Sequence, residues 1–125
     1  MLHVLAPPVC KNSMTLALGD YLVVHGGINN KDAVDNTVWS FNLTTKQWKQ
    51  VTVKGETPAV YGAAATNGSK SDGELSFWKF GGNLEIADEK KRNETPAAAH
   101  YTNGLYQFTL DKTGGQGEWI QHVSP

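Results

Sequence analysis

The side chains best suited to catalysis or metal binding are scattered along this sequence: His3, Cys10, His25, His100 and His122. No two histidines stand three or four residues apart, the spacing that lets a short element hold one metal ion. The single cysteine excludes both an internal disulfide and a cysteine metal cluster. Lys11 beside it would lower the pKa of an accessible thiol, but we expect a sheltered strand position and an inert thiol. We therefore predict no catalytic residue, no metal and no cofactor.

His25 ends an apolar run and directly precedes two glycines, so we interpret it as a packed or hydrogen-bonded strand residue rather than a ligand. The segment KTGGQGEW, residues 112–119, has three glycines but lacks the P-loop spacing, so it is interpreted as a turn. The segment DEKKRNE, residues 88–94, mixes both signs of charge, which is typical of a solvated loop. Glycosylation sequons at Asn42, Asn67 and Asn93 would indicate an adhesion or sugar-binding role only in a secreted protein, and we interpret them as chance matches.

The composition is that of a folded chain with little net charge. It has 125 residues, of which 39% are hydrophobic and 18% charged, enough for one small domain. A formal net charge of −1 lacks the basic excess that nucleic acid or an anionic membrane would attract. No apolar run approaches the roughly 20 residues of a membrane span, and no basic region precedes a hydrophobic core at the N-terminus. With a single cysteine, this favours a reducing compartment, cytoplasmic or nuclear.

The elements that must position these residues are expected to be short strands. A first set covers residues 13–18, 21–25, 37–43 and 48–53, and the third run alternates with period 2. A Gly-Asp pair at residues 19–20 joins the first two strands by a tight turn. The best helical candidate, residues 84–94, has too few apolar residues for a stripe that faces a core.

A second set of strands repeats this order at residues 61–66, 75–80, 105–110 and 119–123, with long polar loops at 67–74 and 83–103. In both sets the second strand ends on a glycine pair, and the fourth strand contains a tryptophan. These shared residues are Gly26, Gly27 and Trp48 in the first set, and Gly81, Gly82 and Trp119 in the second. The recurrence indicates two structural repeats, residues 1–57 and 58–125.

The segments V-H-G-G, W-S-F-N-L-x-T-x-x-W and G-E-T-P carry a resemblance to a known family. A strand that ends on Gly-Gly, an aromatic alternation, a short turn and a tryptophan is similar to the kelch repeat, and two such repeats cover nearly the whole chain. The resemblance implies an all-β fold of two consecutive four-stranded antiparallel blades of a kelch-type β-propeller. Because a propeller ring has about 4–8 blades, two would form an incomplete ring. We therefore expect further blades of the same chain, or self-association, to complete it.

Within such blades the glycine pairs are expected to be structural, because glycine admits close backbone approach at a strand end. The two tryptophans are expected to be equivalent, and to be largely buried between or within the blades.

The expected binding surface is the end of the blades where the loops after the second strands meet the connections between blades, residues 28–36, 54–59 and 83–103. The candidate contacts there are Asn29, Asn30, Lys31, Asp32, Glu85, Lys90, Lys91 and Arg92. Kelch propellers mostly serve as binding platforms, so the resemblance implies a scaffold or adaptor that binds a protein partner and is not an enzyme. The alternative is part of a kelch-type enzyme, such as an epimerase, oxidase or specifier protein, whose active site needs further blades.

Overall fold

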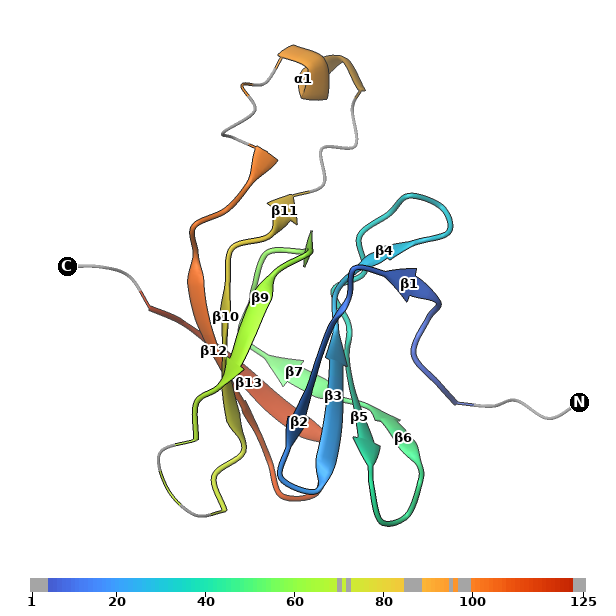
Figure 1. Cartoon of the computed structure of the whole chain (residues 1–125), viewed down its shortest axis with the longest axis vertical. Helices are drawn as coiled ribbons and strands as arrows, with labels where there is room; N and C mark the ends of the chain where they lie inside the picture. Colours follow the sequence, from blue (N-terminus) through green and yellow to red (C-terminus); the bar gives the residue numbers. More distant parts are fainter. Residues whose placement is uncertain are drawn as a thin grey trace, which may run out of the picture.

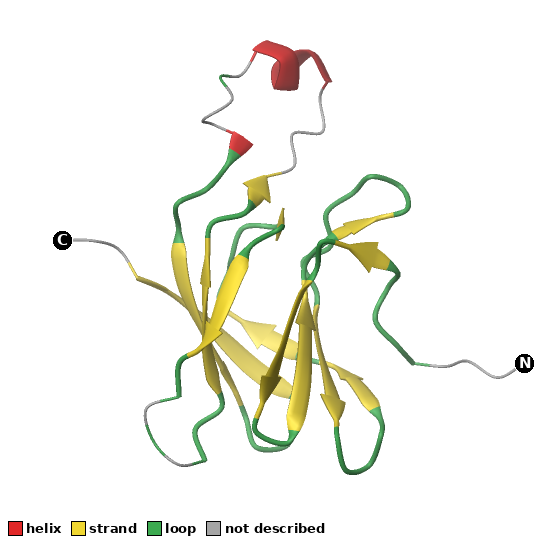
Figure 2. Ribbon diagram, viewed as in Figure 1, coloured by secondary structure: helices red, strands yellow, loops and turns green. Residues whose placement is uncertain are grey.

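The computed structural model describes residues 5–69, 71, 73–84, 89–94, 96 and 100–122. Two large β-sheets stand side by side and pack face to face, and the rest of the described chain forms two short ribbons, loops and one short helix (Figures 1 and 2). The fold is therefore all-β in architecture, as the sequence predicts.

The first sheet is a four-stranded antiparallel meander. Its strands are β2 (Met14–Leu18), β3 (Tyr21–His25), β5 (Val38–Asn42) and β6 (Trp48–Gln50), and they are adjacent in that order. Gly19 and Asp20 alone separate β2 from β3, and Gly19 has a φ of 60°. A two-residue hairpin needs such a positive φ, which glycine adopts without steric cost.

The second sheet repeats the meander with β9 (Ala64–Asn67), β10 (Ser76–Phe80), β12 (Leu105–Leu110) and β13 (Gln116–His122). It also has a fifth strand that the sequence does not predict, because β7 (Thr52–Lys54) pairs parallel with β13. The expected single strand at 48–53 is thus divided at Val51, which is buried and donates its N–H to the Val38 carbonyl. The next amide, that of Thr52, bonds to the Gly115 carbonyl, so the chain passes from the first sheet to the second there.

Two small ribbons extend the sheets at one end. β1 (Cys10–Lys11) pairs with β4 (Ile28–Asn29), and β8 (Val60–Tyr61) pairs with β11 (Asn83–Leu84). The segment at 83–103, expected to be a loop, also contains the short helix α1 (Glu89–Glu94). This charged helix has no apolar stripe from which the sequence could predict it. No helix in the described ranges is long and apolar enough to cross a membrane.

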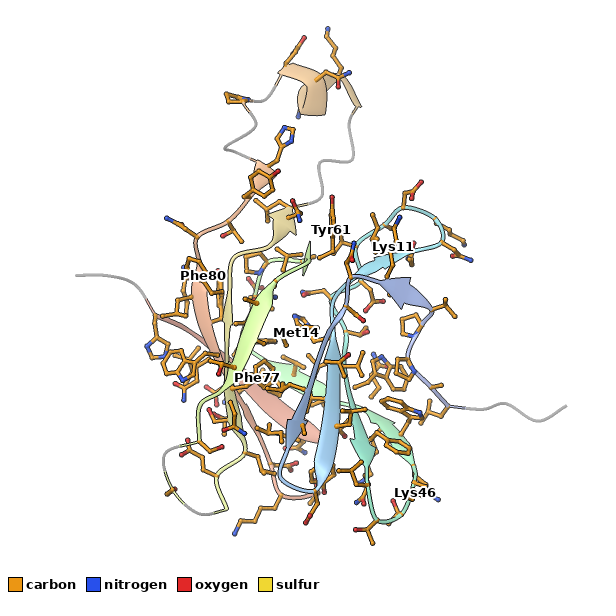
Figure 3. All side chains as sticks on the ribbon, in the orientation of Figure 1. Lys11, Met14, Lys46, Tyr61, Phe77 and Phe80 are labelled. Atoms are coloured by element: carbon orange, nitrogen blue, oxygen red, sulfur yellow. The ribbon has the colours of Figure 1, made fainter. Side chains whose placement is uncertain are left out.

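A hydrophobic core lies between the two sheets. Met14 of the first sheet and Phe77 of the second lie in the space between the two sheets (Figure 3). The other buried members include Leu18, Val23 and Val38 of the first sheet, and Phe108, Leu110 and Trp119 of the second. Trp119 contacts the rings of Phe77 and Phe108 with centroid separations of 5.6 and 4.7 Å. These three rings lie on one face of the second sheet, and Trp119 also reaches the His25 ring of the first sheet, with a centroid separation of 5.0 Å.

The glycine pairs are structural. All four glycines have positive φ, with 98° at Gly27 and 106° at Gly82. A Cβ on Gly27 would lie 2.9 Å from the Lys11 carbonyl oxygen, and one on Gly82 would lie 2.9 Å from the Val60 side chain. The chain must therefore turn sharply after β3 and β10, where neighbouring backbone at Gly27 and the Val60 side chain at Gly82 leave no room for a side chain.

The two tryptophans occupy equivalent places but differ in burial. Trp48 pairs with Phe41 across β5 and β6, and Trp119 pairs with Phe108 across β12 and β13. Trp119 is 5% exposed, whereas Trp48 is only half-buried. Both rings are more than half-buried, as expected, but Trp48 is the more exposed of the two, because in the described chain no sheet covers the face of the first sheet on which it lies.

Replacing Gly27 by alanine should lower the free energy of unfolding by about 1–3 kcal/mol, because a side chain there combines positive φ with a backbone clash. Gly115→Ala is the matched control, since its φ is not positive and its nearest neighbours lie 3.5 Å from an added Cβ. Chemical denaturation of both variants is the measurement. Equal losses of stability would contradict the structural role of the pair.

Trp119→Ala should lower the free energy of unfolding by about 3–5 kcal/mol, as other large aromatic truncations in cores do. Trp48→Ala should cost clearly less, because the half-buried ring already contacts solvent. Denaturant melts of the two variants provide the comparison. A larger loss for Trp48 would show that the core lies on the other face of the first sheet.

Candidate functional site

The loops after the second strands and the connection between the sheets meet at one end of the molecule (Figure 2). The side chain of Asn36 donates to the Thr57 carbonyl at 3.2 Å, and the Gly27 amide donates to the Val60 carbonyl at 3.3 Å. Residues 28–36 and 54–59 therefore form one continuous surface, which we call the rim.

The loop from β4 to β5 is held by its own hydrogen bonds. Asn29 is half-buried, and its side-chain oxygen accepts from the amides of Lys31 at 2.9 Å and Ala33 at 3.1 Å. The Asn29 carbonyl accepts from the Asp32 amide, and Asp32 has a φ of 57°. Asparagine and aspartate favour such local turns, because their short polar side chains bond to nearby backbone groups. The turn leaves the side chains of Asn30, Lys31 and Asp32 exposed on the rim.

The remaining predicted contacts are not part of this turn. Lys90 and Lys91 are exposed on α1, and Arg92 belongs to the same helix. Glu85 lies outside the described residues. α1 stands at the same end of the molecule as residues 28–36, beyond β11 (Figure 1). The structure thus brings Asn29 to Asp32 together in one turn, and places the basic residues on a separate element at that end.

A pocket of about 310 Å³ opens in the rim between the two sheets. Its lining is Asn36, Val53, Gly55, Glu56, Thr57 and Trp119. Glu56 and Asn36 are exposed, whereas Thr57 and Trp119 are buried. The pocket therefore has a polar mouth and one aromatic wall, the composition of a site that takes a small side chain or polar group. A larger pocket of about 480 Å³, lined by β7, the end of β12, the start of β13 and Asp111 between them, contains none of the predicted contacts.

Thr57 and Trp119, two of the pocket residues, also contact a buried polar cluster. Lys79 of β10 is 1% exposed, and His25 of β3 is 2% exposed. The Lys79 Nζ lies 2.8 Å from the His25 Nε2, 3.2 Å from the Thr57 Oγ1 and 3.1 Å from the Pro58 carbonyl oxygen. It also lies 5.1 Å above the Trp119 ring. This cluster joins the first sheet, the connection and the second sheet at one point.

The hydrogen bonds assign the His25 tautomer. The His25 Nδ1 lies 3.0 Å from the Thr37 carbonyl, which can only accept, so Nδ1 carries the proton. The Nε2 is then unprotonated and accepts from the Lys79 amine. Burial first, and then the Lys79 charge, lower the pKa of His25 to about 3, against the opposing effect of the Thr37 bond. The ring is therefore neutral at physiological pH.

The Lys79 amine has no carboxylate among its hydrogen-bond partners in the described chain. Burial lowers the pKa of this amine from 10.5 to about 7, because a charge is poorly solvated between the sheets. Sequence reasoning missed Lys79. The available signal was a lysine two positions before a glycine pair, where period 2 places it on the same face as the buried Phe77.

The other nucleophilic and metal-binding side chains of the described residues do not form a reactive site. Burial, and then the Asp35 charge, raise the pKa of Cys10, which disfavours an activated thiol. Within the described ranges, histidine, cysteine and acidic side chains do not gather into a group that could hold a metal ion. His25 is a buried strand residue bonded to the Thr37 carbonyl, as its place in the sequence predicts.

Comparison with known proteins assigns the fold. Residues 12–52 match the family model of the kelch motif. The chain is also similar to the solved structure of YjhT, a kelch-type propeller protein, with 14% sequence identity and a TM-score of 0.62. That likeness covers 91% of this chain and 38% of the YjhT chain, so the chain spans well under half of its neighbour. No match was found among curated protein sequences.

The stability of the protein should rise with pH between about 7 and 10.5. The unfolded Lys79 amine keeps its usual pKa of 10.5 while the folded amine has a pKa of about 7, so the unfolded state binds more protons in this window. Lys79→Met should remove this rise. Urea melts across the pH range measure it, and Lys112→Met, at an exposed turn residue, should leave it unchanged. Parallel pH profiles for the wild type and Lys79→Met would contradict the assignment.

Proposed function

We propose that this chain is a protein-interaction module that binds a protein partner through the rim. The kelch motif at residues 12–52 and the fold of a kelch-type β-propeller support this proposal. The observation that carries this proposal is the continuity of the rim. Residues 28–36 lie within the first repeat and residues 54–59 span the border between the two repeats, yet one hydrogen bond joins them and one pocket opens between them.

The rim suits recognition because its exposed groups are held by a rigid frame. The backbone of residues 29–35 is fixed by the Asn29 side chain and by the Asp35 amide, which donates to the Gly27 carbonyl at 2.8 Å. Asp35 also accepts from the Thr37 amide and hydroxyl at the base of the loop. Little conformational entropy is then lost when Lys31 and Asp32 contact a partner, which favours affinity.

The charged side chains at this end of the molecule indicate which charges a partner surface would carry. Lys31, Asp32 and Glu56 are exposed on the rim, and α1 adds the exposed Lys90 and Lys91. A stable interface needs about 800 Å² from each partner, more than one turn supplies. We therefore propose that the partner spans the rim and α1 with a polar surface of both signs, and inserts a small group into the rim pocket.

The alternative, part of a kelch-type enzyme, draws on the Lys79–His25 pair, since a neutral lysine near pH 7 is a potential base or nucleophile. Both side chains are at most 2% exposed, and His25, Thr57 and Pro58 surround the Lys79 amine at hydrogen-bond distance. Neither group can touch a substrate in this arrangement. The rim therefore supports binding more strongly than catalysis.

The test is a partner identified by cross-linking and mass spectrometry, followed by titration calorimetry with rim variants. The rim variant combines Lys31→Glu with Asp32→Asn, because asparagine also tolerates positive φ. A second variant, Glu56→Lys, alters the pocket mouth. Each should weaken the affinity about tenfold or more, equivalent to about 1.4 kcal/mol.

Lys46→Glu is the matched control, because Lys46 is an exposed turn residue at the opposite end of the first sheet (Figure 3). It should bind as tightly as the wild type. Unchanged affinity in both rim variants, or a loss confined to Lys46→Glu, would overturn the proposed binding surface.

A further inference from the structure

A buried hydroxyl stands between the rim pocket and the polar cluster beneath it. Thr57 lines the pocket and is only 8% exposed. Its Oγ1 lies 3.2 Å from the Lys79 Nζ, and within the described residues this nitrogen is the one hydrogen-bond partner of the hydroxyl. A hydroxyl can both donate and accept, so the protonation of Lys79 determines which role Thr57 takes.

A neutral Lys79 amine uses the Thr57 proton inside the cluster. The neutral amine has two N–H groups and one lone pair. The His25 Nε2 at 2.8 Å and the Pro58 carbonyl oxygen at 3.1 Å can only accept, so they take both N–H groups. The lone pair is left for the Thr57 hydroxyl, which donates to it.

A protonated Lys79 reverses this hydrogen bond. The ammonium has three N–H groups and no lone pair, so the Thr57 Oγ1 must accept the third. The hydroxyl proton is then released in a residue that is more than nine-tenths buried and that lines the pocket. A buried donor without an acceptor is costly, so an acceptor in the pocket and a proton on Lys79 stabilise each other.

The mouth of the pocket offers acceptors instead of a donor. Glu56 is exposed there, and within the described residues its carboxylate forms no ion pair or hydrogen bond. The Asn36 side chain gives an N–H to the Thr57 carbonyl, which leaves its side-chain oxygen as an acceptor. The pocket therefore pairs one buried donor with two acceptors at its opening.

A primary amide is the side-chain group that satisfies both ends. Its carbonyl oxygen accepts, its NH₂ donates, and it carries no charge. A carboxylate would accept from Thr57, but it would add a second negative charge beside Glu56 and leave the Asn36 oxygen unbonded. An ammonium would give Thr57 no acceptor and would add a positive charge near Lys79.

We propose that the rim pocket binds the primary amide of a glutamine or asparagine side chain, and that Lys79 takes up a proton when it binds. The amide carbonyl accepts from the Thr57 hydroxyl, and the NH₂ group faces Glu56 and Asn36. This inference rests on the proposed function, because it names the group that the protein partner inserts. Lys79 is a positioning residue here, since it acts on the bound group through Thr57.

The coupling gives the binding a pH dependence of defined sign. The titratable side chains that face the Lys79 amine are His25 of β3, Tyr106 directly opposite on β12, and Glu56 at the pocket. His25 has a pKa of about 3 and is neutral, whereas the free Lys79 amine has a pKa of about 7. Above pH 7 the free protein must regain a proton to bind, so the affinity should fall about tenfold or more between about pH 6 and 9.

The test is NMR spectroscopy of the full chain titrated with three probes, the N-acetyl methylamide derivatives of glutamine, glutamate and lysine. Their capped backbone is the same, so differences report the side chain. The glutamine probe should bind about tenfold tighter than the other two, because each of those leaves polar groups unpaired. It should shift the Thr57 signals and raise the pKa of the Lys79 amine.

Variants of the pocket separate the hydroxyl from its neighbours. Thr57→Val should abolish both the preference for glutamine and the pH dependence, and Thr57→Ser should retain both. Thr44→Val, an exposed threonine in the β5–β6 turn, is the matched control and should behave like the wild type. Glu56→Gln should narrow the preference for glutamine over glutamate while the pH dependence persists, and Tyr106→Phe should change neither.

Three results would overturn the proposal: equal affinity for the three probes, tighter binding of the glutamate probe, or a Lys79 pKa that the glutamine probe leaves unchanged. All three are measured on the wild type, so they hold even where a variant fails to fold. The probes need no partner, which separates this inference from the proposed function. Rim variants that weaken a partner while the glutamine probe does not bind would overturn the inference alone. A glutamine probe that binds as expected while rim variants keep full affinity for the partner would support the pocket chemistry and overturn the proposed function.

Discussion

The packing of Trp119 and Lys79 against His25 is the interaction on which the rest of the structure depends. It joins the first sheet to the second, and it also holds the connection between the two sheets through Thr57 and Pro58. Buried polar groups stabilise a fold only when all their hydrogen bonds are made, and here the neutral His25 ring supplies the acceptor that the lysine needs. The cluster therefore acts as a specific joint in an otherwise apolar interface.

The same joint positions the rim. Thr57, which accepts from Lys79 on one side, lines the rim pocket on the other, and its carbonyl accepts from Asn36. The loops that we propose for partner binding are thus anchored to the most buried part of the chain. A rigid frame below exposed loops is the arrangement in which scaffolds of this kind carry binding function.

Much of the fold could be predicted from the sequence, because period-2 alternation, the Gly-Asp turn and the glycine pairs are local signals. The division at Val51 could not be, since the alternation continues through it and only the Gly115 carbonyl of the other sheet decides where Thr52 pairs. The helix α1 lacks the apolar stripe that would reveal it. In the candidate site, residues 29–32 could be predicted together because they form one local turn. Lys79 could not be, because its hydrogen-bond partner His25 lies 54 residues away in the sequence.

The most direct test of this account is nitrogen NMR of the His25 ring and the Lys79 amine across a pH titration. The account predicts a neutral His25 with its proton on Nδ1 down to about pH 4, and a Lys79 amine that loses its proton near pH 7. A His25 that titrates near 6.5 together with a Lys79 that stays charged to pH 10 would contradict the buried pair at the centre of the interface.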